Sequence, residues 1–191
     1  ILTMSIAAMK VLEEQGVRAD MTAGLSLGEY SAYVASGAMD FEEAVALVQK
    51  RGKFMAEAVP SGEGAMYAII GLDQESVEAA CREAVEEGLG LAVPANYNAP
   101  GQIVIAGKTA AAKRAAELAK EKGAKLAVKL KVSGPFHTSL LQPASDRLKP
   151  ELEKMHISCM KIPVYTNVDA QAVASKDDII PILTRQICCP V

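Results

Sequence analysis

GLSLGEYSAYVASGAM, residues 24–39, carries the pattern G-x-S-x-G through Gly24, Ser26 and Gly28. The pattern alone is weak, because common small residues also make ordinary turns. Its context is more informative: a short apolar run before the first glycine predicts a strand, and the residues from Leu27 onward predict a helix. Glycines on both sides allow a sharp strand-to-helix turn that exposes a serine hydroxyl. The stretch therefore predicts either a nucleophile elbow or a small-residue turn that happens to hold a serine.

A serine at such an elbow would lie next to hydrogen-bond donors. Leu27 would be the first helical residue, so its N–H could face an oxygen held at Ser26. Glu29 falls in the first helical turn, where a negative charge suits the positive end of the helix dipole. This arrangement predicts acyl-transfer chemistry, provided that the chain supplies a base elsewhere.

The chain as a whole has 191 residues, half of them hydrophobic, and a net charge of −3. These values predict one globular domain, or one domain with a small insert. No apolar run approaches the ~18 residues of a membrane span. Four cysteines without metal-binding spacing and only two histidines argue against a metal site and favour a reducing, cytoplasmic location. The chain has no Trp, so nucleic-acid binding by base stacking has no support.

Charge is spread unevenly along the chain. Residues 1–100 contain 6 Lys/Arg and 15 Asp/Glu, whereas residues 101–161 contain 12 Lys/Arg and 5 Asp/Glu. Most of these side chains are expected on solvated helix faces. The asymmetry nevertheless predicts that an acidic partner or a phosphate would favour the middle of the chain.

A break at Pro60–Gly64 precedes a self-contained pattern of elements. Strand, helix, strand, strand, helix and strand follow one another, which is the order of a ferredoxin-like unit. We therefore expect a subdomain over residues 62–130, inserted into a core made of residues 1–61 and 131–191.

Arg51 lies on a helix expected over residues 41–58, at the flank of its apolar stripe. It is either an arginine that reaches out from the edge of the core or a group that binds a substrate. Spacing alone favours the first interpretation, because most such arginines are structural.

His137 is the better of two candidate bases. It follows a Gly-Pro turn and stands at the N-terminus of a helix expected from about Ser139. The positive end of a helix disfavours imidazolium and so helps to keep the ring neutral. Nothing around His156 suggests chemistry, and we interpret it as structural. If Ser26 has a histidine base, we expect it to be His137.

Four stretches together resemble the malonyl-CoA:acyl carrier protein transacylases and the related acyltransferase domains of fatty-acid and polyketide synthases. They are GLSLGEYSA, VQKRGKFM, NYNAPGQIVIAG and SGPFHTSLL, in the family's order. The resemblance covers essentially the whole chain and implies an α/β-hydrolase-like core with an inserted ferredoxin-like subdomain. It implies malonyl transfer from malonyl-CoA to acyl carrier protein in fatty-acid biosynthesis. It implies no metal or redox cofactor, and neither a nucleic-acid nor a membrane partner.

The resemblance also assigns catalytic roles. It makes Ser26 the nucleophile and His137 its general base. The Leu27 N–H would hold the oxyanion. Gln186 would orient the His137 ring through its backbone carbonyl, in place of the acid that completes a Ser-His-Asp triad.

Three further residues would form the acyl site by the same resemblance. Arg51 would pair with the free carboxylate of malonyl, which reverses the preference drawn from spacing. A planar guanidinium can hold a carboxylate bidentately, whereas an acetyl group offers it nothing. Met55, one helical turn further on, would line the acyl pocket. Phe136 resembles the residue found in malonyl-selective members.

The sequence departs from the family pattern in two ways. Leu25 stands where the family commonly has His. The family's N-terminal strand, its Gly-Gln-Gly-Ser-Gln loop and its C-terminal segment have no counterpart here, and that loop supplies a second oxyanion donor. Two alternatives therefore stay open: a serine acyl hydrolase or thioesterase, and an inactive fragment that acts only as a docking module.

Overall fold

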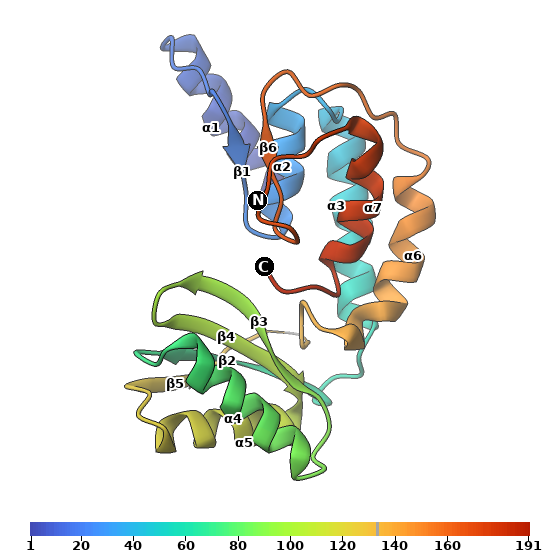
Figure 1. The fold of residues 1–191 in the computed structure, drawn as a ribbon. Coiled ribbons are helices and arrows are strands. Elements are labelled where there is room, and N and C mark those ends of the chain that lie inside the picture. Colours follow the sequence, from blue (N-terminus) through green and yellow to red (C-terminus); the bar gives the residue numbers. More distant parts are fainter. Residues whose placement is uncertain (133) are drawn as a thin grey trace. The chain divides into compact units, whose positions relative to one another are not determined.

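The computed structural model describes residues 1–132 and 134–191. The chain divides into two compact units (Figure 1), and each is described by itself. The first comprises residues 1–53 and 145–186; the second comprises residues 54–144 and 187–191.

Two short parallel strands organise the first unit. β1 (Thr22–Ala23) pairs with β6 (Val164–Tyr165), so that segments far apart in the sequence meet at one edge. The carboxyl ends of parallel strands lie together, and both strands end where the candidate elbow begins.

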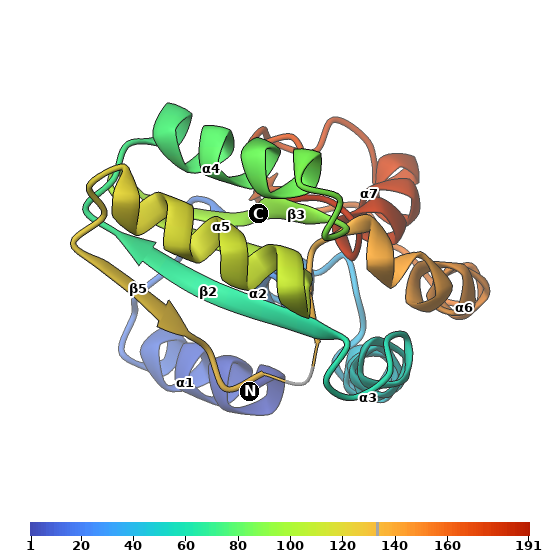
Figure 2. The same ribbon diagram turned by 90° about the horizontal axis from the view of Figure 1, so that it is seen from below.

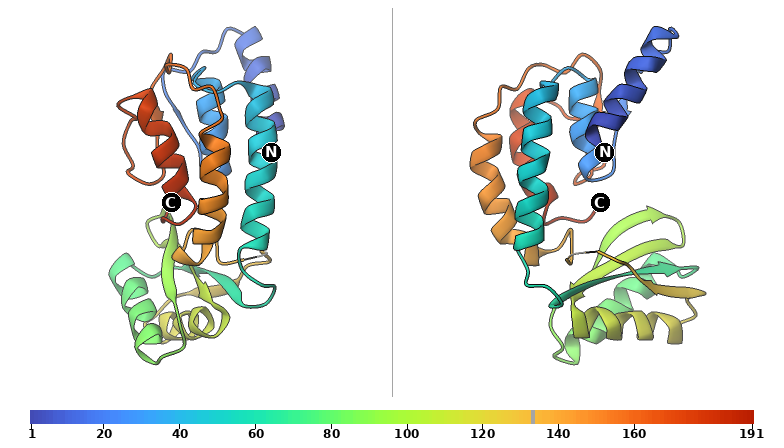
Figure 3. Two further views of the ribbon diagram at one scale, coloured as in Figure 1. Left: turned by 90° about the vertical axis from the view of Figure 1, so that its right-hand side faces the viewer. Right: turned by 180° about the vertical axis from the view of Figure 1, so that it is seen from behind.

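Helices make up most of the rest of this unit (Figure 3). α1 (Leu2–Glu14) packs against α2 (Leu27–Ala35). α3 (Phe41–Glu57), α6 (Gln142–Leu152) and α7 (Ile179–Gln186) run beside one another. The 3₁₀ segments Ser139–Leu141 and Lys176–Asp178 precede α6 and α7.

Large side chains of α2, α6 and α7 are completely enclosed and fix the start of α2. The members of this core with no exposed surface include Tyr30, Tyr33, Leu148, Leu152, Ile179 and Leu183. Burying a side chain of this size stabilises the fold by about 1.5–3 kcal/mol. The helix that begins at the elbow is therefore anchored in a well-packed core.

Asp40 caps the start of α3. One carboxylate oxygen of Asp40 accepts hydrogen bonds from the backbone N–H groups of Glu42 (2.8 Å) and Glu43 (3.1 Å). These bonds satisfy donors that the first turn of α3 leaves without intrahelical partners.

The second unit contains a four-stranded antiparallel sheet in the order β3-β4-β2-β5. The strands are β2 (Gly64–Ile70), β3 (Ala92–Ala99), β4 (Gln102–Lys108) and β5 (Leu126–Lys129). α4 (Gln74–Glu86) and α5 (Thr109–Glu121) cover one face of the sheet (Figure 2). The predicted order of elements is confirmed, while the subdomain bounds at residues 62 and 130 stay a prediction.

Alanines let α5 approach α4 and the sheet closely. Five of them are buried: Ala111, Ala112, Ala115, Ala116 and Ala119. They pack with larger side chains of the strands and α4, among them Ile69, Ile105 and Val77. Small residues on one element and large ones on the other give the dense packing of a protein interior.

The last strand of the sheet, β5, is short and mostly exposed. Leu126 and Val128 are 54% and 50% exposed. Side chains alternate across a strand, and Ala127 packs with the helix-side core, so these two lie on the opposite face. β5 is also an edge strand, which leaves that face only partly covered.

Acidic neighbours neutralise much of the basic charge in residues 101–161. Arg114 pairs with Glu87 at 2.9 Å, and Lys122 pairs with Glu83 at 2.6 Å. No ion pair of the described residues involves Lys129 of β5. Lys129, at the edge of the sheet, is therefore one basic group of this region that stays available to a partner.

Across residues 1–132 and 134–191, no helix combines the length and the apolar composition needed to cross a membrane.

Candidate active site

Ser26 occupies a strained turn between β1 and α2. Its φ is 53° and its ψ is −100°, a backbone conformation that costs a non-glycine residue about 1–3 kcal/mol. Gly24 is required here, because a Cβ at that position would collide with the backbone of Gly28 and Glu29. At Gly28, by contrast, a Cβ would meet open space. The elbow predicted from G-x-S-x-G is present, and its first glycine is the one that sterics demand.

Asn167 holds this elbow from the neighbouring strand. Its side-chain amide donates to the Gly24 carbonyl (2.8 Å) and accepts from the Ser26 N–H (2.6 Å). The amide thus satisfies two backbone groups that the turn leaves without strand partners, the Gly24 carbonyl and the Ser26 N–H. The sequence analysis missed this residue. The available signal was a polar side chain directly after an apolar strand that pairs in parallel with β1.

Leu27 is the first residue of α2. Its N–H is one of the donors that a helix leaves without an intrahelical acceptor. It adjoins Ser26, as the predicted oxyanion role requires. The role itself stays a prediction.

Arg51 lies in the middle of the buried stripe of α3, not at its flank. The buried positions are Ala44, Leu47, Arg51 and Met55, and only 4% of the Arg51 surface is exposed. The apolar pattern predicted a stripe of Val45, Val48, Met55 and Val59, and the last two are buried. In the first half of the helix Ala44 and Leu47 are buried instead of Val45 and Val48, so Arg51 lies within the stripe and the expectation of a flanking arginine was wrong.

The Arg51 guanidinium contacts the nucleophile directly. Its Nη2 donates to Ser26 Oγ (2.8 Å) and to Gln186 Oε1 (3.1 Å). The Tyr30 ring lies under it, with the guanidinium carbon 5.3 Å from the ring centroid. Among the residues that the structure describes, no acceptor reaches the buried Arg51 Nε.

Gln186, the last residue of α7, is fully buried beside the elbow. Its Nε2 donates to the Ser26 carbonyl (3.1 Å) and to Glu29 Oε2 (2.8 Å). The residue predicted to act through its backbone therefore also bridges three members of the site with its side chain.

Glu29 has no exposed surface. Besides Gln186, its carboxylate accepts from the Asn167 N–H (3.0 Å) and the Tyr33 hydroxyl (3.4 Å). Burial raises the pKa of Glu29, and the hydrogen bonds from Gln186, Asn167 and Tyr33 and the charge of Arg51 oppose that rise. Burial likewise raises the pKa of Tyr30 to about 12.

His137 belongs to the second unit and has two unusual features. It is 4% exposed, and its φ of 60° is on the left-handed side. Only two other non-glycine residues in the described part of the chain share a positive φ, Ser26 and Ala170. Thr138 caps the following 3₁₀ segment by accepting from the Leu140 N–H (3.3 Å), so the predicted place at a helix start is confirmed.

The remaining predicted site residues also lie in the second unit. Phe136 packs on the sheet against a cluster that includes Met66 and Val104. Met55 is 7% exposed near the end of α3. His156, which was interpreted as structural, belongs to the first unit and is exposed, outside any helix or strand. The structure thus brings Ser26, Leu27, Arg51 and Gln186 together in the first unit.

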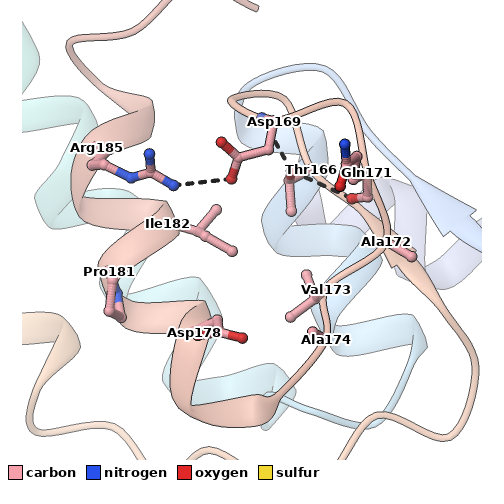
Figure 4. Close-up of a pocket in the computed structure, with 10 residues that line it drawn as sticks. All are labelled: Thr166, Asp169, Gln171, Ala172, Val173, Ala174, Asp178, Pro181, Ile182 and Arg185. Atoms are coloured by element: carbon pink, nitrogen blue, oxygen red, sulfur yellow. Dashed lines mark hydrogen bonds and ion pairs between the residues drawn. The ribbon is translucent and has the colours of Figure 1, made fainter.

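Two grooves lie in the first unit. One, of about 260 Å³, lies beside α7 and is bordered by the ion pair between Arg185 and Asp169 (2.9 Å; Figure 4). The other, of about 720 Å³, runs between α1 and α2 and is lined by Ile6, Met9 and Ala32 among others. In the described part of the chain, no group of three His, Cys, Asp or Glu residues could hold a metal ion.

A comparison with protein-family models identifies the family of this chain. The model described as "Acyl transferase domain" matches residues 1–182. The chain belongs to this family. The site of this member combines a serine elbow with a buried arginine that touches the serine oxygen.

Curated relatives and solved structures agree with this assignment. The chain is 50% identical to each of two proteins named malonyl CoA-acyl carrier protein transacylase, from Bacillus subtilis and from Escherichia coli K12. All of the chain is covered, but it spans only 60% and 62% of those proteins.

The solved structures show how similar the fold is. A structure of MCAT from Streptococcus pneumoniae is 52% identical, with a TM-score of 0.93 over the whole chain and 62% of that protein. A malonyl-transacylase in complex with a type II PKS acyl-carrier protein is 46% identical, with a TM-score of 0.95 over the whole chain and 61% of that protein. These likenesses confirm the predicted α/β fold class.

Proposed function

We propose that the protein transfers a malonyl group from malonyl-CoA to the phosphopantetheine thiol of an acyl carrier protein, through a malonyl ester on Ser26. The main support is the 2.8 Å contact between Arg51 Nη2 and Ser26 Oγ. In malonyl, a single methylene separates the carboxylate from the acyl carbon that the serine attacks. A cation that touches the nucleophile is therefore within reach of that carboxylate.

The Arg51 Nε, which no acceptor reaches among the described residues, supports the same substrate. A buried donor without an acceptor costs about 1–3 kcal/mol. A bound carboxylate would accept from this N–H and from one of the guanidinium amino groups, as planar carboxylates do with arginine. An acetyl group has no acceptor to offer there.

In the first half-reaction His137 takes the proton from Ser26 Oγ, and the oxygen attacks the thioester carbon of malonyl-CoA. The Leu27 N–H stabilises the resulting oxyanion. The C–S bond then breaks, and the imidazolium of His137 returns its proton to the departing CoA sulfur. The product is malonyl-Ser26.

In the second half-reaction the carrier-protein thiol gives its proton to His137 and attacks the malonyl ester. The ester bond breaks, and Ser26 Oγ recovers the proton. Oxidation states do not change and no water is consumed, so the chemistry calls for no cofactor. Gln186 would hold the His137 ring through its carbonyl, while Met55 and Phe136 would border the acyl group.

The names of the relatives support both substrates. Two of them are called malonyl CoA-acyl carrier protein transacylase, and one solved relative is a complex with an acyl-carrier protein. We assign the reaction to fatty-acid biosynthesis in the cytoplasm. The four cysteines, which lack metal-binding spacing, suit that reducing location.

The fate of the acyl group tests this proposal. The natural full-length protein is loaded with labelled malonyl-CoA, freed of excess CoA ester and split into two samples. Addition of holo carrier protein should move the label to the carrier within one turnover, while buffer alone should release it slowly. Equal loss of label to water in both samples would instead identify a hydrolase, and failure to load at all would favour a docking module.

A further inference from the structure

Glu29 is a buried carboxylate at the centre of the site to which the proposed chemistry assigns no step. Its polar contacts come from Gln186 Nε2 (2.8 Å), the Asn167 N–H (3.0 Å) and the Tyr33 hydroxyl (3.4 Å). All three groups donate, and an ionised carboxylate only accepts, so the contacts fit the ionised form.

This carboxylate determines which way the Gln186 amide points. Because Glu29 accepts from Nε2, the other end of the amide, Oε1, is left for Arg51. A reversed amide would place an oxygen against the carboxylate and an NH₂ against the NH₂ of Arg51. Both contacts would be repulsive, so Glu29 fixes the acceptor that Arg51 uses.

Gln186 also keeps the two charges apart. In the described part of the chain no ion pair joins Arg51 to any carboxylate. A direct contact with Glu29 would satisfy the guanidinium and compete with an incoming carboxylate. The intervening neutral amide holds the guanidinium in place and leaves its charge available to a substrate.

We propose that Glu29 is a positioning residue that acts through Gln186 to hold the Arg51 guanidinium beside Ser26, and thereby sets the preference for acyl groups that carry a carboxylate. This proposal rests on the proposed function, because it concerns how the acyl group is chosen. It gives Glu29 a role in substrate selectivity, beyond the favourable placement of a negative charge at the start of a helix.

The test substitutes Glu29→Gln in the natural full-length protein and measures single-turnover acylation by malonyl-CoA and by acetyl-CoA. The new amide can keep its oxygen toward Gln186 Nε2 and the Asn167 N–H and turn its NH₂ to the Tyr33 hydroxyl, but it loses the negative charge. Hydrogen bonds to a neutral acceptor are weaker, so the Gln186 amide is held in its direction less firmly. We expect the malonyl-to-acetyl ratio of kcat/KM to fall by on the order of 10-fold or more, as misplacement of a positioning group typically does. Acylation by acetyl-CoA should change little.

A double-mutant cycle separates positioning from general loosening of the fold. In an Arg51→Ala background, Glu29→Gln should leave the ratio unchanged, because no guanidinium remains to be positioned. Ser145→Ala is the matched control. It removes another buried hydrogen bond of this unit, from Ser145 Oγ to the Thr184 carbonyl (2.7 Å), and should not alter the ratio.

If Glu29→Gln does not fold, Gln186→Leu tests the same link by removing the amide at similar size, and the ratio should fall again. An unchanged ratio in the folded Glu29 variant, or in Gln186→Leu, would overturn the proposal. So would an equal fall of the ratio with and without Arg51. A parent protein that forms no malonyl ester would instead disprove the proposed function.

Discussion

Replacement of Arg51 by alanine should change the malonyl-to-acetyl ratio of kcat/KM more than any other single substitution. The substitution removes the guanidinium whose Nη2 lies 2.8 Å from Ser26 Oγ and whose Nε has no acceptor among the described residues. The proteins to compare are the parent, Arg51→Ala and Arg51→Lys, each as the natural full-length chain.

The size of the effect follows from the contacts that are lost. Hydrogen bonds to charged groups contribute about 1.5–3 kcal/mol each, and a bidentate carboxylate would make two of them. Water that enters the space left by the side chain takes back part of this energy. A net loss of about 2.7 kcal/mol corresponds to roughly 10²-fold in kcat/KM, and we expect at least this loss for malonyl-CoA.

Acetyl-CoA should react as before or faster with Arg51→Ala, because its methyl group no longer faces a buried guanidinium that no carboxylate of the described residues pairs. Arg51→Lys should recover only part of the malonyl activity, since an ammonium lacks the planar fork of the guanidinium. Gln186 loses a donor in both variants, so a modest loss of stability is expected as well.

The assay is single-turnover acylation by each CoA ester, read as the malonyl-to-acetyl ratio. Lys50→Ala is the control on the same helix. Its side chain is 52% exposed and pairs with Glu151 at 2.6 Å, so neither substrate should be affected. If Arg51→Ala lowered both activities in parallel and kept the ratio, the arginine would be a structural residue of the core.

Three other predictions concern the base, the elbow and the docking surface. His137→Ala should slow acylation by about 10²–10⁴-fold in a stopped assay with malonyl-CoA, whereas His156→Ala should have little effect; similar rates in the two variants would contradict the assignment. Asn167→Ala should lower kcat and the melting temperature together, because the elbow loses two hydrogen bonds of about 1 kcal/mol each; an unaltered kcat would show that the turn holds itself. Lys129→Glu should raise KM for an acidic carrier protein at low salt but not for a small thiol, whereas Arg114→Glu, which changes a residue already paired with acidic neighbours, should act less; equal KM values in all three proteins would place docking elsewhere.

The order of secondary structure followed from the sequence because its signals are local. Short apolar runs predicted β2 and β4, and Gly123, which follows an alanine-rich run, predicted the end of α5 within two residues. Tight contact of Gly24 with the next helix explains why the elbow motif was readable from the sequence. These features depend on neighbours only a few positions away in the chain.

The contacts of the site could not be predicted in the same way, because they join distant segments. Asn167 meets the elbow from 141 positions away, through a parallel strand pairing that periodicity does not specify. Glu29 was interpreted only as a favourable charge at a helix start, since its link to Gln186 spans 157 positions. Arg51 was placed at the flank of its helix because Ala44 and Leu47 are buried where the apolar pattern favoured Val45 and Val48, one position further on.

Counting charged residues along the sequence also overestimated how much basic charge is available to a partner. The basic excess of the middle region is real, but Arg114 and Lys122 are already paired with acidic side chains of α4 and the loop after it. Which charges remain available depends on how two helices pack, and this information is absent from composition.

The malonyl ester on Ser26 is the most direct measurement of the mechanism proposed for this chain. The natural full-length protein is mixed with malonyl-CoA, quenched in acid within one turnover and digested, and the peptides are weighed. We predict a single added malonyl group on the peptide that contains Ser26, and none in Ser26→Ala. A malonyl group that persists in Ser26→Ala, or one found on a cysteine such as Cys189, would contradict the assignment of the nucleophile.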